Sequence, residues 1–222
     1  YEEHKDAFSY TGWTEEKILT ILVYGALLHD VAKPDCRTVD EEGIHHFHGH
    51  PEAGAKKAKQ ILRRLKFDND TISMVGRMIL YHDRRYEQCY DKGAYCAKGK
   101  RGMRRLMNQI GEDAMPFLFL LQKADLLAQS DYTREEKLAK LSAAVKAWKD
   151  VLASNEAVKV SDLSIGGRDL IRNGIAPGPG LGEILHYLLE QVLEDPALNE
   201  LDKLLSMALK YNQNKKGKNE DE

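Results

Sequence analysis

Apolar positions recur every three or four residues through most of the chain, which is the spacing of amphipathic α-helices. No segment shows the strict alternation of apolar and polar residues that is typical of a β-strand. The pattern therefore predicts an all-α fold. The expected helices cover approximately residues 15–28, 51–65, 69–79, 101–110, 112–127, 133–151, 182–194 and 196–211.

The helix expected before residue 29 is the most apolar one in the chain. Thr14 is a suitable N-cap, and nearly every position from Ile18 to Leu28 is apolar. A helix that is apolar on all sides is normally buried on all sides. We therefore expect this helix to run through the centre of the core and to end before Pro34.

The character of the chain changes near residue 155. Residues 161–181 are rich in glycine and include the turn sequence Pro177-Gly178-Pro179-Gly180. Residues 212–222 contain no apolar side chain, which predicts disorder. The expected organisation is a helical domain over 1–155, a small C-terminal helical domain over 156–211, and a disordered tail.

Composition excludes several classes of protein. The formal net charge of −2 gives no overall basic field for nucleic acid, so any such contact must come from local patches. The three cysteines lack the paired spacing of a zinc knuckle, which favours free thiols in a reducing compartment. No apolar run is long enough for a membrane span, and we expect a cytoplasmic protein without a membrane partner.

Three of the expected helices each place a metal-capable side chain on their apolar side. His29 and Asp30 end the most apolar helix, while His82 and Asp125 continue the apolar stripes of two others. Burying an ionised carboxylate is costly unless it is paired or bound to a metal. One such residue would be an ordinary hydrogen-bonded core histidine or a salt-bridged aspartate. Together they favour a divalent cation with mixed nitrogen and oxygen ligands.

A dense group of histidines lies between the first two helices. His45, His46, His48 and His50 fall within six residues, which is also compatible with a polar loop or a structureless metal-binding tract. His50 immediately precedes a helix, so backbone geometry should hold it in place. We expect His50 to be a metal ligand and the other three to be loop residues.

Two groups of cations are candidates for binding phosphate. Lys33 shares a helix face with His29 and Asp30, where it could hold a phosphate oxygen or simply extend its ammonium group to solvent. A second group follows a glycine-containing loop and could contact substrate phosphates or an RNA backbone. This second group consists of Lys98, Lys100, Arg101, Arg104 and Arg105.

Four segments of the chain resemble a known family. Leu27–Pro34 (LLHDVAKP), Phe47–Ala55 (FHGHPEAGA), Ile79–Asp83 (ILYHD) and Lys123–Ser130 (KADLLAQS) are similar to the HD domain of CCA-adding tRNA nucleotidyltransferases and bacterial poly(A) polymerases. The tail, Asp162–Glu200, resembles the C-terminal helical segment of the same family. The HD motifs alone indicate only the phosphohydrolase superfamily, and the tail narrows the resemblance to the tRNA enzymes.

The resemblance implies an HD-domain helical bundle and a set of metal ligands. His29, Asp30 and Asp125 match the HD motif directly, and His50 and His82 match the additional histidines of two-metal members. His4 is the only histidine that precedes His29, so it is the candidate for the leading ligand. The implied cofactor is one or two divalent ions of Mg, Mn, Ni, Co, Fe or Zn.

The resemblance also implies an activity. The expected reaction is metal-dependent hydrolysis of phosphoesters on nucleotides or RNA 3′ ends, as a 2′,3′-cyclic phosphodiesterase, 2′-nucleotidase or phosphatase. Lys33, Arg84 and Arg85 would neutralise the phosphate, and Asp83 would orient the water. The sequence lacks the glycine-serine loop and paired aspartates of the family's transferase head, so we do not expect this chain alone to add nucleotides.

Two other interpretations stay open. The chain could be a body module that binds tRNA, with a structural or vestigial metal site. It could also be an HD nucleotide phosphohydrolase with no relation to tRNA, although the resemblance of the tail speaks against this.

Overall fold

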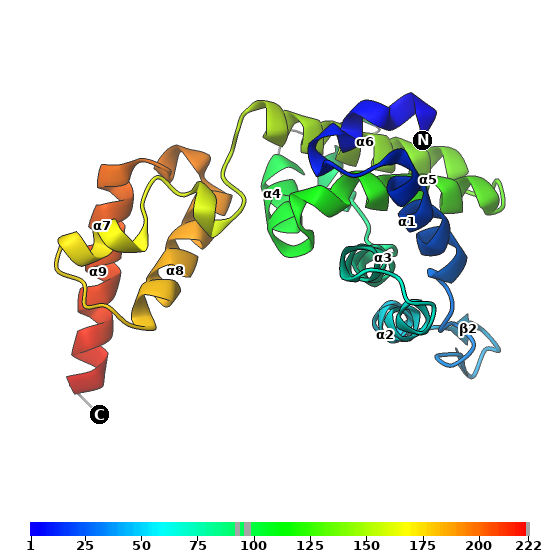
Figure 1. The fold of residues 1–222 in the computed structure, drawn as a ribbon, viewed down its shortest axis with the longest axis horizontal. Coiled ribbons are helices and arrows are strands. Elements are labelled where there is room, and N and C mark those ends of the chain that lie inside the picture. The colour runs from blue at the N-terminus through cyan, green and yellow to red at the C-terminus, as the bar shows by residue number, and fades with distance from the viewer. Residues whose placement is uncertain (92–93, 96–98, 221–222) are drawn as a thin grey trace. The chain divides into compact units, whose positions relative to one another are not determined.

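The computed structural model of the chain describes residues 1–91, 94–95 and 99–220; for residues 2–4, 10, 88, 90–91, 94–95 and 216–220 only the backbone is described. Within these residues the fold is all-α, as predicted, with nine α-helices and two pairs of two-residue strands (Figure 1). The chain forms two compact units. The first comprises Tyr1–Cys96 and Ile110–Val145, and the second comprises Ala97–Gln109 and Lys146–Glu222.

The first unit is built mainly from α1, α2, α3 and α5, and the first part of α6. Figure 1 shows α2 and α3 nearly end-on and next to each other, in agreement with their extensive packing. The strand pairs are antiparallel, β1 with β2 and β3 with β4. The elements of this unit are η1 (Glu2–Thr11), α1 (Glu15–Leu28), β1 (Thr38–Val39), β2 (His45–His46), α2 (His50–Arg64), α3 (Asn69–Tyr81), η2 (Glu87–Cys89), β3 (Tyr90–Asp91), β4 (Ala94–Tyr95), η3 (Glu112–Ala114), α5 (Met115–Ala128) and α6 (Arg134–Ala153).

Helix α1 begins as expected, because the Thr14 side chain accepts a hydrogen bond from the backbone N–H of Lys17. The expectation that this helix is buried on all sides is wrong. One face is buried, but Leu19, Val23 and Leu27 on another are 38%, 60% and 70% exposed. The reason is that α1 packs on α3 and α5, which cover only one side. Apolar composition alone therefore did not identify the buried face.

Close packing of α1 on α3 fixes the positions of the two helix ends relative to each other. A Cβ atom added to Gly25 would lie 2.5 Å from the Cε of Met78, so the glycine permits the two helices to approach. Helix α3 begins at an N-cap, Asp68, whose side chain accepts hydrogen bonds from the backbone N–H groups of Asp70 and Thr71. Both helices end at a histidine, His29 and His82 respectively.

The second unit has its own core. Buried residues of α7, α8 and α9 form this core, including Leu170, Leu188, Val192 and Leu204, and Figure 1 shows the three helices grouped together. The elements are α4 (Gly99–Ile110), the end of α6, η4 (Val160–Asp162), α7 (Gly167–Arg172), α8 (Gly180–Glu194), η5 (Pro196–Leu198) and α9 (Leu201–Glu220).

Two expectations about organisation differ from this arrangement. The two compact units divide near residue 145, and Ala97–Gln109 belongs to the second unit. The domain boundary expected near residue 155 stays a prediction. Helix α9 continues to Glu220 where composition predicted disorder from Asn212, and Lys215 on this extension forms an ion pair with Glu183 of α8. None of the described helices combines the length and the apolar character needed to cross a membrane.

Candidate metal centre

Three histidine rings are oriented by the same local hydrogen bond. The Nδ1 atoms of His29, His50 and His82 lie 2.8, 2.8 and 2.7 Å from the backbone carbonyls three residues earlier, those of Ala26, Phe47 and Ile79. A carbonyl oxygen can only accept, so each Nδ1 carries a proton, and the tautomer that this selects for a neutral ring has its lone pair on Nε2. Metal-binding histidines are commonly fixed in this way.

The Nε2 atoms converge on two carboxylates, one from the turn after α1 and one from α5. His50 Nε2 and His82 Nε2 are 3.2 Å apart, and each lies 3.5 Å from Asp30 Oδ1. His29 Nε2 lies 3.2 Å from Asp30 Oδ2 and 3.5 Å from Asp125 Oδ1. Asp30, His50 and His82 offer ligand atoms that all lie within 4.8 Å of one another. We call these three residues and their neighbours His29 and Asp125 the metal cluster, the candidate site for an ion. Metal–ligand bonds of about 2.0–2.2 Å place neighbouring donors of one ion roughly 3 Å apart, which is the size of these separations.

The chemistry of the cluster fits a divalent cation. His29 Nε2 and Asp30 Oδ1 are buried and have no hydrogen-bond partner among the described residues, which is costly unless something else satisfies them. Two neutral imidazole lone pairs at the separation of His50 and His82 also repel unless a cation or proton lies between them. Three nitrogens and two carboxylates are a mixed donor set that suits a divalent transition metal.

Electrostatics keep the donors in their metal-binding forms. Burial raises the pKa of Asp30, but the ammonium group of Lys33 at 2.6 Å and the neighbouring imidazoles outweigh this, so the pKa lies below its ordinary value. Burial is also the largest effect on His82, and it holds the pKa of that imidazole below its ordinary value. Asp30 is therefore ionised and His82 neutral, as ligands must be.

The three histidines expected to be loop residues lie apart from the five residues of the metal cluster, and the remaining predicted ligand, His4, lies outside the described side chains. His46 contacts Asp40 at 2.7 Å and stacks on His48, and His45 accepts a hydrogen bond from Arg37. These three loop histidines are not part of the metal cluster. His4 lies in η1, but its side chain is outside the part of the chain that the structure describes.

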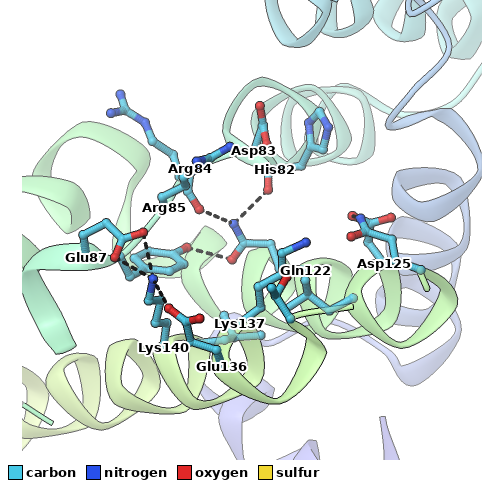
Figure 2. A pocket seen from close by; sticks show the side chains of 15 residues that line it. His82, Asp83, Arg84, Arg85, Glu87, Gln122, Asp125, Glu136, Lys137 and Lys140 are labelled. Atoms are coloured by element: carbon cyan, nitrogen blue, oxygen red, sulfur yellow. Dashed lines mark hydrogen bonds and ion pairs between the residues drawn. The ribbon is translucent and has the colours of Figure 1, made fainter. Parts of the chain in front are cut away.

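A groove opens beside the metal cluster. It has a volume of about 310 Å³ and shares His82 and Asp125 with the cluster. Figure 2 shows its walls: the segment after α3, one face of α5 and one face of α6. Asp83, Arg84 and Arg85, predicted from sequence to serve the substrate, all line this groove. Arg84 also lies over the ring of Tyr81, at 5.6 Å.

Gln122 connects the segments that carry two of the candidate ligands, His82 and Asp125, and sequence reasoning did not identify it. Its side-chain amide donates to the backbone carbonyls of His82 and Arg84, at 2.8 and 3.1 Å, and accepts from the hydroxyl of Tyr86 at 2.8 Å. Figure 2 shows these bonds tying the segment after α3 to α5, the helix of Asp125. The available signal was a glutamine within an apolar helix, because a buried amide must find partners.

The predicted basic group belongs to the second unit, and glutamates hold its charges there. The Arg104 side chain is 6% exposed, forms an ion pair with Glu156 at 2.6 Å, and donates to the carbonyl of Leu193 at 2.8 Å. Arg101 and Arg105 both form ion pairs with Glu194. Lys98 lies outside the described residues.

Comparison with known proteins finds similarity to one sequence family and to two tRNA nucleotidyltransferases. The sequence model of the family described as tRNA nucleotidyltransferase domain 2 matches residues 41–208. The CC-adding tRNA nucleotidyltransferase of Thermus thermophilus is 31% identical over 176 residues, which are 76% of this chain and 35% of that protein. The A-adding tRNA nucleotidyltransferase of Deinococcus radiodurans is 26% identical over 196 residues, which are 84% of this chain and 42% of that protein.

The chain therefore spans less than half the length of either relative. No solved structure matches the chain with significance.

Proposed function

Because the chain belongs to the tRNA nucleotidyltransferase domain 2 family, we propose that its first unit is an HD-type, divalent-metal-dependent phosphohydrolase acting on phosphoesters of nucleotides or RNA ends. The observation that carries the proposal is the metal cluster. Three imidazole Nε2 atoms and two carboxylates from distant parts of the sequence face one another, and the buried atoms His29 Nε2 and Asp30 Oδ1 have no hydrogen-bond partner among the described residues. A cluster of this kind lowers the stability of the fold when no ion is bound, which favours a functional purpose.

His29, Asp30, His50, His82 and Asp125 would hold the ion, and His4 is a further candidate. A bound divalent ion supplies a Lewis acid for a phosphoryl oxygen and lowers the pKa of water. The chain's own residues bind and orient the substrate. Lys33, beside Asp30, would neutralise a phosphate oxygen.

The residues after α3 would also act on the phosphate and the water. Arg84 and Arg85 line the groove and would neutralise remaining phosphate charge, and Asp83 would orient the attacking water by accepting its hydrogen bond. In a 2′,3′-cyclic substrate a new P–O bond forms to water and one ring P–O bond breaks. The released sugar oxygen takes the proton, leaving a phosphomonoester.

Hydrolysis of 2′,3′-cyclic AMP tests this proposal. Purified protein is assayed with Mg²⁺, Mn²⁺, Ni²⁺ or Co²⁺, alongside Asp30→Ala and a control, His186→Ala, which changes a histidine outside the metal cluster. The proposal predicts turnover that needs added metal, that is lost in Asp30→Ala and that is kept in His186→Ala. Turnover equal to that of Asp30→Ala under every metal would refute it for this substrate.

A second candidate function is binding of tRNA. The names of the matched relatives, which are tRNA nucleotidyltransferases, favour it. The basic group of α4 is the predicted contact, although Arg101, Arg104 and Arg105 each already pair with a glutamate. Affinity for tRNA measured at low and high salt tests this function. Binding driven by phosphate contacts weakens steeply with salt, and an affinity that does not change excludes binding of this kind.

A further inference from the structure

The groove beside the metal cluster has room for more than a phosphate group. Its volume of about 310 Å³ is at the lower end of the range for small-molecule sites. Because His82 and Asp125 belong to both the groove and the metal cluster, a phosphoester held at the cluster would extend the rest of its molecule into the groove (Figure 2).

The wall formed by α6 carries two lysines with different surroundings. Lys140 lies 2.9 Å from Glu87 and 2.8 Å from Glu136, so its charge is used within the protein. The side chain of Lys137 is exposed and has no ion-pair or hydrogen-bond partner in the part of the chain that the structure describes. Lys137 is therefore the lysine on this wall that is available to an anion from outside.

The remaining surfaces of the groove suit a nucleoside. Leu126 of α5 and Leu141 of α6 offer apolar area, while Gln129 and Thr133, from the segment between these two helices, offer hydrogen-bonding groups. Arg85 lines the groove from the segment after α3, and Lys137 lines it from α6. A ligand with a sugar and base between two phosphates would use both the surfaces and the cations.

We propose that the groove binds the nucleoside that carries the reacting phosphoester, and that Lys137 binds the next phosphate along the strand. The preferred substrate is then the end of an RNA strand and not a free mononucleotide. This inference rests on the proposed phosphohydrolase function, and it adds Lys137 as a residue that determines specificity.

The experiment compares two substrates that differ in this second phosphate and the nucleoside attached to it, and the Lys137 variant isolates the contribution of the phosphate. One is adenosine 2′,3′-cyclic phosphate, and the other is the dinucleotide ApA ending in a 2′,3′-cyclic phosphate. The wild type should favour the dinucleotide in kcat/KM by about tenfold, the size of one charge-assisted contact. Lys137→Gln should reduce this ratio to about one. Lys149→Gln, which removes an exposed charge elsewhere on α6, should leave the ratio unchanged.

A binding measurement separates the failure of this inference from the failure of the proposed function. Calorimetry compares the affinities for the 3′-phosphates of ApA and of adenosine, which need no turnover. If neither cyclic substrate is hydrolysed but the dinucleotide binds more tightly through Lys137, the hydrolase proposal fails and the groove assignment stands. If Lys137→Gln leaves the dinucleotide preference intact, or if the wild type shows no preference in either assay, the groove assignment is overturned.

Discussion

Gln122 is a buried side chain, and its contribution to stability depends on how many of its polar atoms form hydrogen bonds. Its amide N–H groups and its carbonyl oxygen all have partners, and the partners belong to the short stretch His82, Arg84 and Tyr86. The Tyr86 hydroxyl is itself buried, which raises the pKa of Tyr86 well above its ordinary value and keeps the hydroxyl a donor. These three hydrogen bonds therefore position the end of α3, and His82 with it.

Gln122→Leu should destabilise the protein by about 2–3 kcal/mol, because it leaves the buried Tyr86 hydroxyl and two partly buried carbonyls without this partner. Tyr86→Phe removes one hydrogen bond and should cost about 1 kcal/mol. The double variant should lose less than the sum, since the hydroxyl that Gln122→Leu orphans is then absent. Urea unfolding measures all three, and strictly additive losses would contradict this assignment.

At the scale of elements, the starts of several helices were predictable from the sequence. Thr14, Pro51 and Asp68 mark the starts of α1, α2 and α3 at or within a residue of their predicted positions, because caps are local features. The exposed face of α1 was not predictable, because it depends on which helices pack against it. The short helix α7 and the two-residue strands were also missed, since so few residues carry no periodic signal.

Asp68 gives a prediction about pH at the start of α3. Hydrogen bonds from the Thr71 hydroxyl and from Lys17 hold the pKa of Asp68 well below its ordinary value. A carboxyl with a depressed folded-state pKa stabilises the fold above its unfolded pKa of 3.8 and loses this contribution as pH falls below it. Asp68→Asn, which keeps a capping side chain, should therefore lose less Tm than the wild type between about pH 5 and pH 3.

Asp68→Ala serves as the matched comparison, because it removes the cap as well. It should lower stability at neutral pH by about 1 kcal/mol, and more than Asp68→Asn does. Thermal unfolding across the pH range tests both variants. A wild type and an Asp68→Asn variant with parallel Tm profiles below pH 4 would show that Asp68 does not carry this dependence.

In the second unit, Arg104 connects α4 to the end of α8. It pairs with Glu156 while donating to the carbonyls of Leu193 and Glu194, which are among the last of that helix. From sequence, Arg104 and its neighbours were candidates for phosphate binding. Spacing along the chain could not reveal glutamates that lie some 50 to 90 residues away in sequence.

Arg104→Met should destabilise the second unit by about 2–3 kcal/mol, because it leaves Glu156 with Lys100 as its remaining cationic partner and removes the hydrogen bonds to the carbonyls of Leu193 and Glu194. Arg101→Met removes a far more exposed guanidinium and should cause a much smaller loss. Chemical denaturation followed by circular dichroism compares the two. Equal losses would mean that burial of the Arg104 pair does not govern its contribution.

At the scale of the whole molecule, the all-α fold was predictable because helical periodicity extends over most of the chain. The apolar stripes ending in His29, His82 and Asp125 also indicated which side chains meet, since each faced the core of the first unit. The division into units was harder to predict. Residues Ala97–Gln109 join a unit whose other residues begin at Lys146, and such a long-range association leaves no local trace in the sequence.

The most direct test of the metal cluster is a titration of the metal-free protein with Mn²⁺ or Co²⁺, followed by calorimetry. The wild type should bind the ion, and His50→Ala should weaken binding by about 10- to 100-fold or more, because a ligand is lost. His186→Ala removes another carbonyl-bonded histidine, on α8, and should bind like the wild type. A wild type that binds neither ion, or a His50→Ala variant that binds as well as the wild type, would contradict the account.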